Sequence, residues 1–495
     1  MSKHIAPSRA LSTAVVALLA ACSVGPDYHR PDAPVPATYK EGWKPSEPQD
    51  TIDRGAWWSI YHDPVLDQLE RQIDISNQNL RAAEASYREA RAVVAQARSG
   101  YFPTISVAAS ATRSGQSSNS TAGVTSGAGI TRFGGGARTQ YDLTADASWS
   151  LDVWGRIRRT VESDIANAQA SAADLASARL SAQASLATDY FDLRATDELK
   201  RLLDAAVVAF TQSLEITRNQ YRVGVAGQTD VVTAQTQLET TRAQAVAVGV
   251  QRAQFEHAIA VLVGKPASEF SIEPAPMPSN IPVVPTDVPS TLLERRPDIA
   301  AAERLMAAAN AQIGAAEAAY YPDLTLSASY GFVSTSLDTL LHASNAVWSV
   351  GPTVAETLFN GGLRGAQLDQ ARAVYDQNVA TYRQTVLTGF QQVEDQLAAL
   401  RILAQQAEVE ANAVGLAREA ERLTLNQYKA GTVAYTAVIT AQTQALNNEQ
   451  TQLTILQNRL AASVALVQAL GGGWTTTQLP SDGDIKDNNP LHLLR

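Results

Sequence analysis

Two long stretches of the sequence carry the hydrophobic spacing of coiled-coil helices. In the second stretch, apolar residues recur at alternating steps of four and three: Val386, Phe390, Val393, Leu397, Leu400, Ala404, Ala407, Ala411 and Val414. The first stretch keeps a similar spacing with two polar positions: Leu238, Thr241, Ala245, Val248, Arg252, Phe255, Ile259 and Leu262. Upstream of the glycine turns, no proline interrupts 157–221 or 363–428. At 1.5 Å per residue, each of these runs predicts a helix of about 100 Å.

Each long run ends at a glycine-containing turn, after which a second helical segment begins. The turns are Val223-Gly224-Val225-Ala226-Gly227 and Ala430-Gly431-Thr432. Glycine adopts the positive φ values that end helices, so the chain can reverse there. We therefore predict two antiparallel helical hairpins, at 157–263 and 363–470.

Four other segments alternate apolar and polar residues with a period of two, which predicts strands. Two lie in 103–153 and two in 322–357, the last about Ala346 to Ala355. Strands of this length with one apolar face are typical of transmembrane β-barrels. Four strands are too few to close a barrel, and an open sheet edge in lipid leaves backbone groups unpaired. We therefore expect several copies to form the barrel together, and three copies supply 12 strands.

Proline positions and an internal repeat divide the chain in two. No proline lies between Pro103 and Pro266 or between Pro352 and Pro480, whereas eight fall within 266–297. The segment 219–224 matches 426–431 at an offset of 207, and 101–103 matches 320–322 at an offset of 219. The difference indicates a 12-residue insertion in the first half. We predict two repeats, 64–265 and 298–472, with a proline-rich linker at 266–297 and a tail at 473–495.

The N-terminus has the features of an export signal. A basic start is followed by an apolar run that is too short to cross a bilayer as a helix and ends Leu19-Ala20-Ala21-Cys22. This ending resembles a bacterial lipobox, which predicts a signal peptide at 1–21, a covalent lipid on Cys22 and a lipidated extended segment at 22–63. Ser23, which is not Asp, favours the outer membrane over the inner one.

Composition excludes several kinds of chemistry. The 495 residues include one cysteine, so neither an intrachain disulfide nor a zinc site built on several cysteines is possible. The net charge of −10 argues against binding to nucleic acid, which requires a basic excess. The six histidines are scattered without a metal-binding motif. We expect neither an enzyme nor a cofactor.

Together the lipobox, the strand pairs and the paired hairpins resemble the TolC-like outer-membrane efflux channels, specifically their lipoprotein (OprM/NodT-type) branch. The resemblance extends over nearly the whole chain through motifs in the family's order: Gly25-Pro26-Asp27-Tyr28, Trp57-Trp58, 151–156, 295–299, 358–362 and 469–474. It implies an α+β membrane protein: a homotrimer with a 12-stranded β-barrel, four strands from each chain, continued by a long periplasmic α-helical coiled-coil barrel. It also implies a periplasmic adaptor (a membrane fusion protein) and an inner-membrane RND-type pump as partners, and outer-membrane lipid around the barrel.

The resemblance also assigns candidate site residues. The adaptor-contacting tips are Arg222, Val223, Gly224 and Val225 in the first hairpin and Lys429, Ala430, Gly431 and Thr432 in the second. The pore constriction is expected at Tyr428, Thr436, Thr440 and Thr443. Family members often have an apolar, an acidic and a basic residue at the last three positions. Their replacement by threonines here puts a salt-bridged closed state in doubt and suggests a gate held by packing and neutral hydrogen bonds.

Two other functions remain open from the sequence. The same fold serves as the exit duct of type I protein secretion, although the lipoprotein motifs favour small-molecule efflux. A non-conducting envelope scaffold lipoprotein is the alternative from another class, but a scaffold does not require strands with a lipid-facing side. The exported compounds cannot be identified from the chain.

Overall fold

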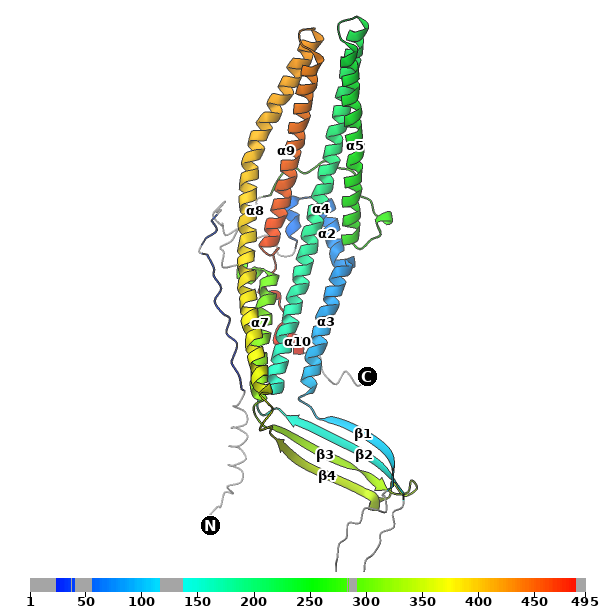
Figure 1. Ribbon diagram of the computed structural model, residues 1–495, viewed down its shortest axis with the longest axis vertical. Coiled ribbons are helices and arrows are strands. Elements are labelled where there is room, and N and C mark those ends of the chain that lie inside the picture. Colours follow the sequence, from blue (N-terminus) through cyan, green and yellow to red (C-terminus); the bar gives the residue numbers. More distant parts are fainter. Residues whose placement is uncertain are drawn as a thin grey trace, which may run out of the picture.

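The computed structural model describes residues 24–36, 38–40, 56–115, 137–282, 284 and 292–486. These residues form an elongated molecule with long helices at one end and a four-stranded sheet at the other (Figure 1). The first repeat contains α2 (Pro64–Ser76), α3 (Gln78–Ser99), β1 (Thr104–Ser114), β2 (Arg138–Leu151), α4 (Arg156–Arg222) and α5 (Gln228–Leu262). The second contains α6 (Leu292–Arg295), α7 (Pro297–Ala318), β3 (Asp323–Ser334), β4 (Ala346–Ala355), α8 (Leu363–Lys429) and α9 (Tyr435–Ala469). The short elements are η1 (Trp57–Tyr61), η2 (Ala267–Glu269), η4 (Ala343–Asn345), η5 (Thr476–Gln478) and α10 (Asp482–Lys486).

The three longest helices have the same lengths in the two repeats. α4 and α8 have 67 residues each, α5 and α9 have 35, and α3 and α7 have 22. Residues 115–137 join β1 to β2, whereas residues 335–345 join β3 to β4. This difference equals the 12-residue insertion expected in the first half from the sequence.

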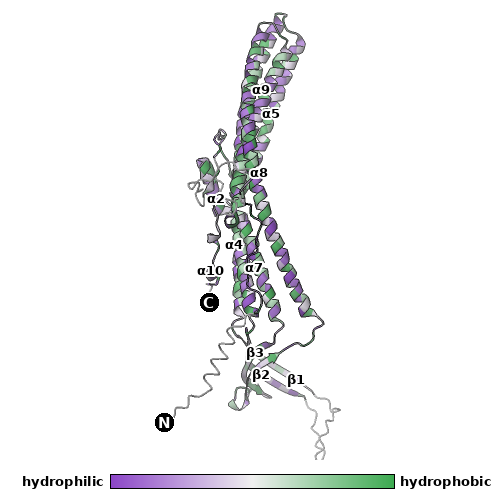
Figure 2. Ribbon diagram, turned by 90° about the vertical axis from the view of Figure 1, so that its left-hand side faces the viewer, coloured by the Kyte–Doolittle hydropathy of each residue, from purple (hydrophilic) through white to green (hydrophobic). Residues whose placement is uncertain are grey.

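The long helices lie side by side in a layer. In its upper half the order is α8, α9, α4 and α5, and in its lower half α8, α7, α4 and α3 (Figure 1). α4 therefore packs on α5 and α9 above and on α3 and α7 below. In Figure 2, polar and apolar residues alternate along every long helix, because the seams between helices are apolar and the free faces are polar.

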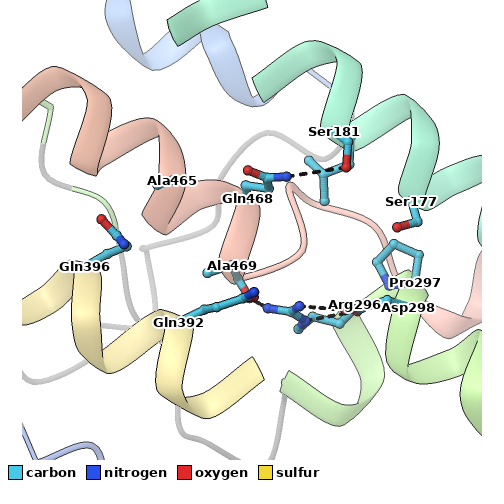
Figure 3. A pocket seen from close by; sticks show the side chains of 11 residues that line it. Ser177, Ser181, Arg296, Pro297, Asp298, Gln392, Gln396, Ala465, Gln468 and Ala469 are labelled. Atoms are coloured by element: carbon cyan, nitrogen blue, oxygen red, sulfur yellow. Dashed lines mark hydrogen bonds and ion pairs between the residues drawn. The ribbon is translucent and has the colours of Figure 1, made fainter. Parts of the chain in front are cut away.

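Each long helix is flanked by two shorter helices placed end to end, and a glycine makes each junction possible. Gly264 follows α5 with φ +69°, and a Cβ there would lie 2.2 Å from the carbonyl oxygen of Ser76. Gly471 follows α9 with φ +94°, and its Cβ would lie 2.1 Å from the carbonyl oxygen of Arg295. At the second junction Arg296 Nη1 donates to the carbonyl oxygen of Ala469 at 2.9 Å, while its other nitrogens pair with Asp298 (Figure 3).

The predicted coiled-coil seam is largely confirmed. Val386, Phe390, Val393, Leu397 and Val414 are buried. The prediction that Ala411 belongs to the seam was wrong, because this residue is exposed. Glu410 is half-buried in its place. Between Ala407 and Val414 the spacing of seam residues is therefore three and then four, not four and then three. In α5, Leu238, Thr241, Ala245, Val248 and Ile259 are buried, as their spacing predicts.

The strands form one antiparallel sheet in the order β1-β2-β3-β4. The register places apolar residues opposite each other across all four strands, for example Val107 with Ala145, Ala145 with Tyr330, and Tyr330 with Trp348. One face of the sheet is therefore apolar throughout, and the other carries Asp142, Asp146 and a series of Ser and Thr residues. Within the described residues, β1 and β4 each have an unpaired edge. Among the described helices, none has the length and apolar character needed to span a bilayer.

Candidate functional sites at the two ends of the helices

The chain just after the predicted lipidation site is fixed at the border between sheet and helices. Cys22 itself lies outside the described residues. The backbone N–H of Val24 donates to the carbonyl oxygen of Trp154 at 3.3 Å. The buried guanidinium of Arg159 donates to the carbonyl oxygens of Val24 and Gly25 and pairs with Asp27 at 3.1 Å. These contacts place the start of the segment beside the end of the strands.

From this border the N-terminal segment extends along the helices towards the tips (Figure 1). The hydroxyl of Tyr28 donates to Glu303 in α7 at 2.6 Å, and Arg30 donates to the hydroxyl of Tyr382 in α8 at 2.8 Å. Further along, the ring of Tyr39 contacts Phe390. The segment thus connects α7 and α8 of the second repeat to the border between sheet and helices.

Aromatic side chains gather at the same border. The rings of Trp154 and Tyr321 stack at 4.8 Å, and Trp154 Nε1 donates to the carbonyl oxygen of Pro322. Phe102 and Phe359 are 56% and 89% exposed. The first pair therefore has a packing role within the chain, whereas Phe102 and Phe359 are available to contacts outside it.

The first hairpin tip is exposed and apolar. Val223 and Val225 are 75% and 64% exposed, and Arg222 is also exposed. Gly224 turns the chain with φ +78°, and nothing lies within 4 Å of where its Cβ would be. The predicted tip residues therefore project together from the end of the layer.

The second tip has the same turn but a different surface. Gly431 has φ +76°, and Lys429, Ala430 and Thr432 are exposed. The backbone N–H of Thr432 donates to the carbonyl oxygen of Gln427. This tip offers small and polar groups in the positions where the first offers valines.

Below the second tip, the two hairpins are joined by neutral hydrogen bonds. Gln220 Nε2 in α4 donates to the carbonyl oxygen of Tyr428 at 3.0 Å, and the Tyr428 hydroxyl donates to Thr217 Oγ1 at 3.3 Å. Gln442 Nε2 in α9 donates to Ser213 Oγ at 2.9 Å. We call these five residues the hairpin latch. Sequence reasoning missed Ser213, Thr217, Gln220 and Gln442, because short polar residues on a long helix look like a solvated face.

The side chain of Tyr428 is only 4% exposed and its ring packs on Tyr435 at 5.2 Å. The expected place of Tyr428 at the pore constriction stays a prediction. Burial raises the pKa of Tyr435 to about 12 and also raises that of Tyr428, so both hydroxyls stay neutral.

The three threonines at the expected constriction lie along α9. Thr436 and Thr440 are exposed and Thr443 is half-buried. Thr440 Oγ1 donates to the carbonyl oxygen of Thr436 at 2.9 Å, which is a bond within the helix. Thr440 therefore makes no link to the other hairpin.

The described residues contain no group of His, Cys, Asp and Glu suited to a metal ion. A cavity of about 390 Å³ beside the α9–α7 junction is lined by amides, hydroxyls and Arg296 (Figure 3). The guanidinium of Arg296 is already bonded to Asp298 and Ala469, so it has no nitrogen directed at a substrate.

Comparison with known proteins identifies the family. The model of the outer membrane efflux protein family matches residues 69–265 and 288–472, one segment in each repeat. The chain belongs to this family. It is 32% identical over 471 residues to the toluene efflux pump outer membrane protein TtgC of Pseudomonas putida, covering 94% of this chain and 95% of that protein. It is 28% identical to the probable outer membrane lipoprotein SilC of Salmonella typhimurium, covering 94% of this chain and 98% of SilC.

Solved structures of similar proteins show the same fold. The outer-membrane channel OprN superposes with a TM-score of 0.84 at 29% identity, covering 92% of this chain and 100% of OprN. The structural neighbours are trimeric TolC-like channels. The expected fold class is therefore confirmed, with four strands from each chain in a trimeric barrel and a helical barrel beyond it. The protein is an outer-membrane component of an efflux system, in the lipoprotein branch of the family.

Proposed function

We propose that three copies of this chain form a passive conduit that carries small molecules from an inner-membrane RND-type pump and a periplasmic adaptor to the exterior. The observation that carries the proposal is the two-ended architecture. At one end lies a sheet with a single apolar face and two open edges, and at the other lie paired hairpin tips. Open edges in lipid are tolerated only if other copies complete the barrel. The conduit makes no covalent change to its cargo and uses no cofactor.

The proposed anchor is a lipid on Cys22. This proposal is supported by Val24, two positions after Cys22 in the sequence, which is held at the border between sheet and helices. The stacked and exposed aromatic residues at the same border support this placement, because aromatic side chains favour the membrane interface.

The adaptor would bind both tips, with the first supplying most of the apolar contact. Val223 and Val225 lose exposed apolar surface on docking, whereas Ala430 and Thr432 offer little. Regarding the cargo, one relative is named for toluene efflux, which favours hydrophobic small molecules here. No feature favours protein secretion or a scaffold over efflux.

The test is complementation of a strain that lacks this channel. We expect deletion to increase accumulation of an efflux dye several-fold, and the wild-type chain to restore export. Val223→Asp with Val225→Asp should not restore export, because two charges would be buried against the adaptor. The matched control is Val208→Asp, an exposed valine on α4 away from the tip, which should restore it.

Normal export with both tip substitutions would refute the docking assignment. No change in dye accumulation after deletion, with adaptor and pump both present, would refute the efflux role.

A further inference from the structure

Among the residues of the four described strands, Arg113 of β1 is the one charged residue on the apolar face of the sheet. The register pairs Arg113 with Thr139 and, nearer the helices, Ile105 with Ala147, so Arg113 shares the face of the apolar residues. The other charged residues of the strands lie on the opposite face: Arg138, Asp142, Asp146 and Asp323. In the barrel the apolar face contacts lipid, where an isolated charge is costly unless it has a partner at its own depth.

Arg113 lies at the outer end of this face. β1 begins beside the helices at Thr104 and extends away from them, and Arg113 is nine residues further along (Figure 1). At 3.4 Å per residue this is about 31 Å along the strand, which a tilt of about 40° reduces to about 23 Å across the membrane. The apolar band of such barrels is about 25 Å tall. Arg113 is therefore at the level where the acyl chains of the outer leaflet meet their headgroups.

The described part of the chain provides no anion for this arginine. Arg113 is exposed and makes no hydrogen bond or ion pair with another described residue. Asp142, the nearer of the two carboxylates of β2, is on the opposite face and accepts hydrogen bonds from Ser110 and Gln140. A guanidinium at this level attracts an anionic lipid headgroup instead.

The residues beside Arg113 are suited to a phosphorylated headgroup. Thr139 is directly opposite in the register, so the two Cβ atoms are about 5 Å apart and the hydroxyl can add a hydrogen bond to the same group. Tyr141 is the diagonal neighbour on this face and is half-buried. Tyrosine favours the interface between acyl chains and headgroups. Guanidinium groups bind phosphate through parallel N–H donors, which gives the site its chemical preference.

We propose that Arg113, with Thr139 beside it, binds the phosphate of a glycolipid in the outer leaflet, of which lipid A is the representative. The occupant is a lipid and not a soluble anion, because the site borders the apolar face along which acyl chains lie. β1 is an edge of the sheet, so in the trimer each of the three sites lies beside the junction of two copies. The inference depends on the trimeric barrel and is independent of the cargo and the adaptor.

Native mass spectrometry tests the site on purified trimers washed free of copurified lipid, with bisphosphorylated lipid A as the probe. The wild type should bind up to three molecules in each trimer. Arg113→Gln should weaken binding about tenfold, the size of one charge-assisted contact. Arg113→Lys should retain most of the binding, because the charge remains.

The matched control is Arg138→Gln. Arg138 pairs with Ser114, so it is an arginine at the same depth as Arg113 but on the opposite face of the sheet. This variant should bind the probe as the wild type does. Lipid A without its phosphates should bind the wild type about as weakly as bisphosphorylated lipid A binds Arg113→Gln.

Three results would overturn the inference. They are equal binding of bisphosphorylated lipid A to the wild type and Arg113→Gln, an equal loss in Arg138→Gln, and displacement of lipid A by inorganic phosphate at the same concentration. The last result would show a site for soluble anions. Conductance of the wild-type trimers is recorded separately in planar bilayers, and its absence would refute the proposed function without bearing on the lipid site.

Discussion

The two repeats have hairpin helices of identical length but use the ends of their hairpins differently. Tyr221 and Tyr428 occupy equivalent positions at the offset of 207 residues, yet Tyr221 is 47% exposed and Tyr428 only 4%. The first tip exposes valines, whereas the second buries its tyrosine against the other hairpin. One duplicated unit has thus acquired a surface suited to docking, and the other a contact that holds the hairpins together.

The largest expected difference in stability is between alanine substitutions of the two equivalent tyrosines. Tyr428→Ala should lower the free energy of unfolding by about 3–5 kcal/mol, because it leaves a cavity between the hairpins. Tyr221→Ala should cost less than about 1 kcal/mol, because its ring is half exposed. Urea unfolding followed by the helical circular dichroism signal measures both. Equal losses in the two variants would show that the tips do not differ in packing.

The next largest difference in stability is between alanine substitutions of two glycines in the second repeat, one at the junction and one at the tip. Gly471→Ala should cost about 3 kcal/mol, because its Cβ would clash with the carbonyl oxygen of Arg295 at a positive φ. Gly431→Ala should cost about 1 kcal/mol, since it has a positive φ but open space around it. The same unfolding measurement applies. A Gly431 variant less stable than the Gly471 variant would contradict the end-to-end junction.

A smaller effect, on the leak conductance, distinguishes the hairpin latch from the three threonines of α9 (Thr436, Thr440 and Thr443). Tyr428→Phe removes one neutral hydrogen bond to Thr217, worth about 1 kcal/mol, and should raise the leak conductance of closed trimers several-fold. Thr440→Ala removes only a bond within α9 and should leave the leak nearly unchanged. Planar-bilayer recordings at low voltage distinguish them. A large leak in the Thr440 variant alone would place the gate at the threonines.

The smallest effect concerns pH and again distinguishes the repeats. Burial, with the carboxylate of Asp192 nearby, raises the pKa of Asp189 to about 6, while the equivalent position in the second repeat is Gln396. The folded protein thus binds this proton more tightly than the unfolded chain, whose value is about 4. Stability should therefore fall as pH rises from about 4 to about 6, by roughly 1 kcal/mol after allowance for solvent screening.

Asp189→Asn should remove that part of the pH dependence. Gln396→Asn, the control in the other repeat, should keep it. Unfolding curves between pH 4 and 7 provide the comparison. A pH profile unchanged by Asp189→Asn would show that the carboxyl titrates normally in the folded protein.

Much of the fold could be predicted from local patterns. The strand at Ala346–Ala355, the long helices and their turns follow from periodicity and from glycine and proline positions. The end-to-end junctions could not be predicted, because Gly264 and Ser76 meet only in three dimensions. The same holds for the hairpin latch, since Ser213 and Gln442 are ordinary polar residues until two helices bring them together. The burial of Tyr428 could not be predicted either, because sequence position near the tip does not reveal which side of the helix a residue occupies.

The central claim is that this chain assembles into a conducting outer-membrane channel, and single-channel recording tests it most directly. Purified trimers of the full-length lipidated protein are inserted into planar bilayers, and the current is recorded for the wild type and for Tyr428→Phe, which lacks the hydrogen bond to Thr217. The account predicts stepwise currents through both proteins. Correctly folded, membrane-inserted trimers that carry no current in either protein would contradict it.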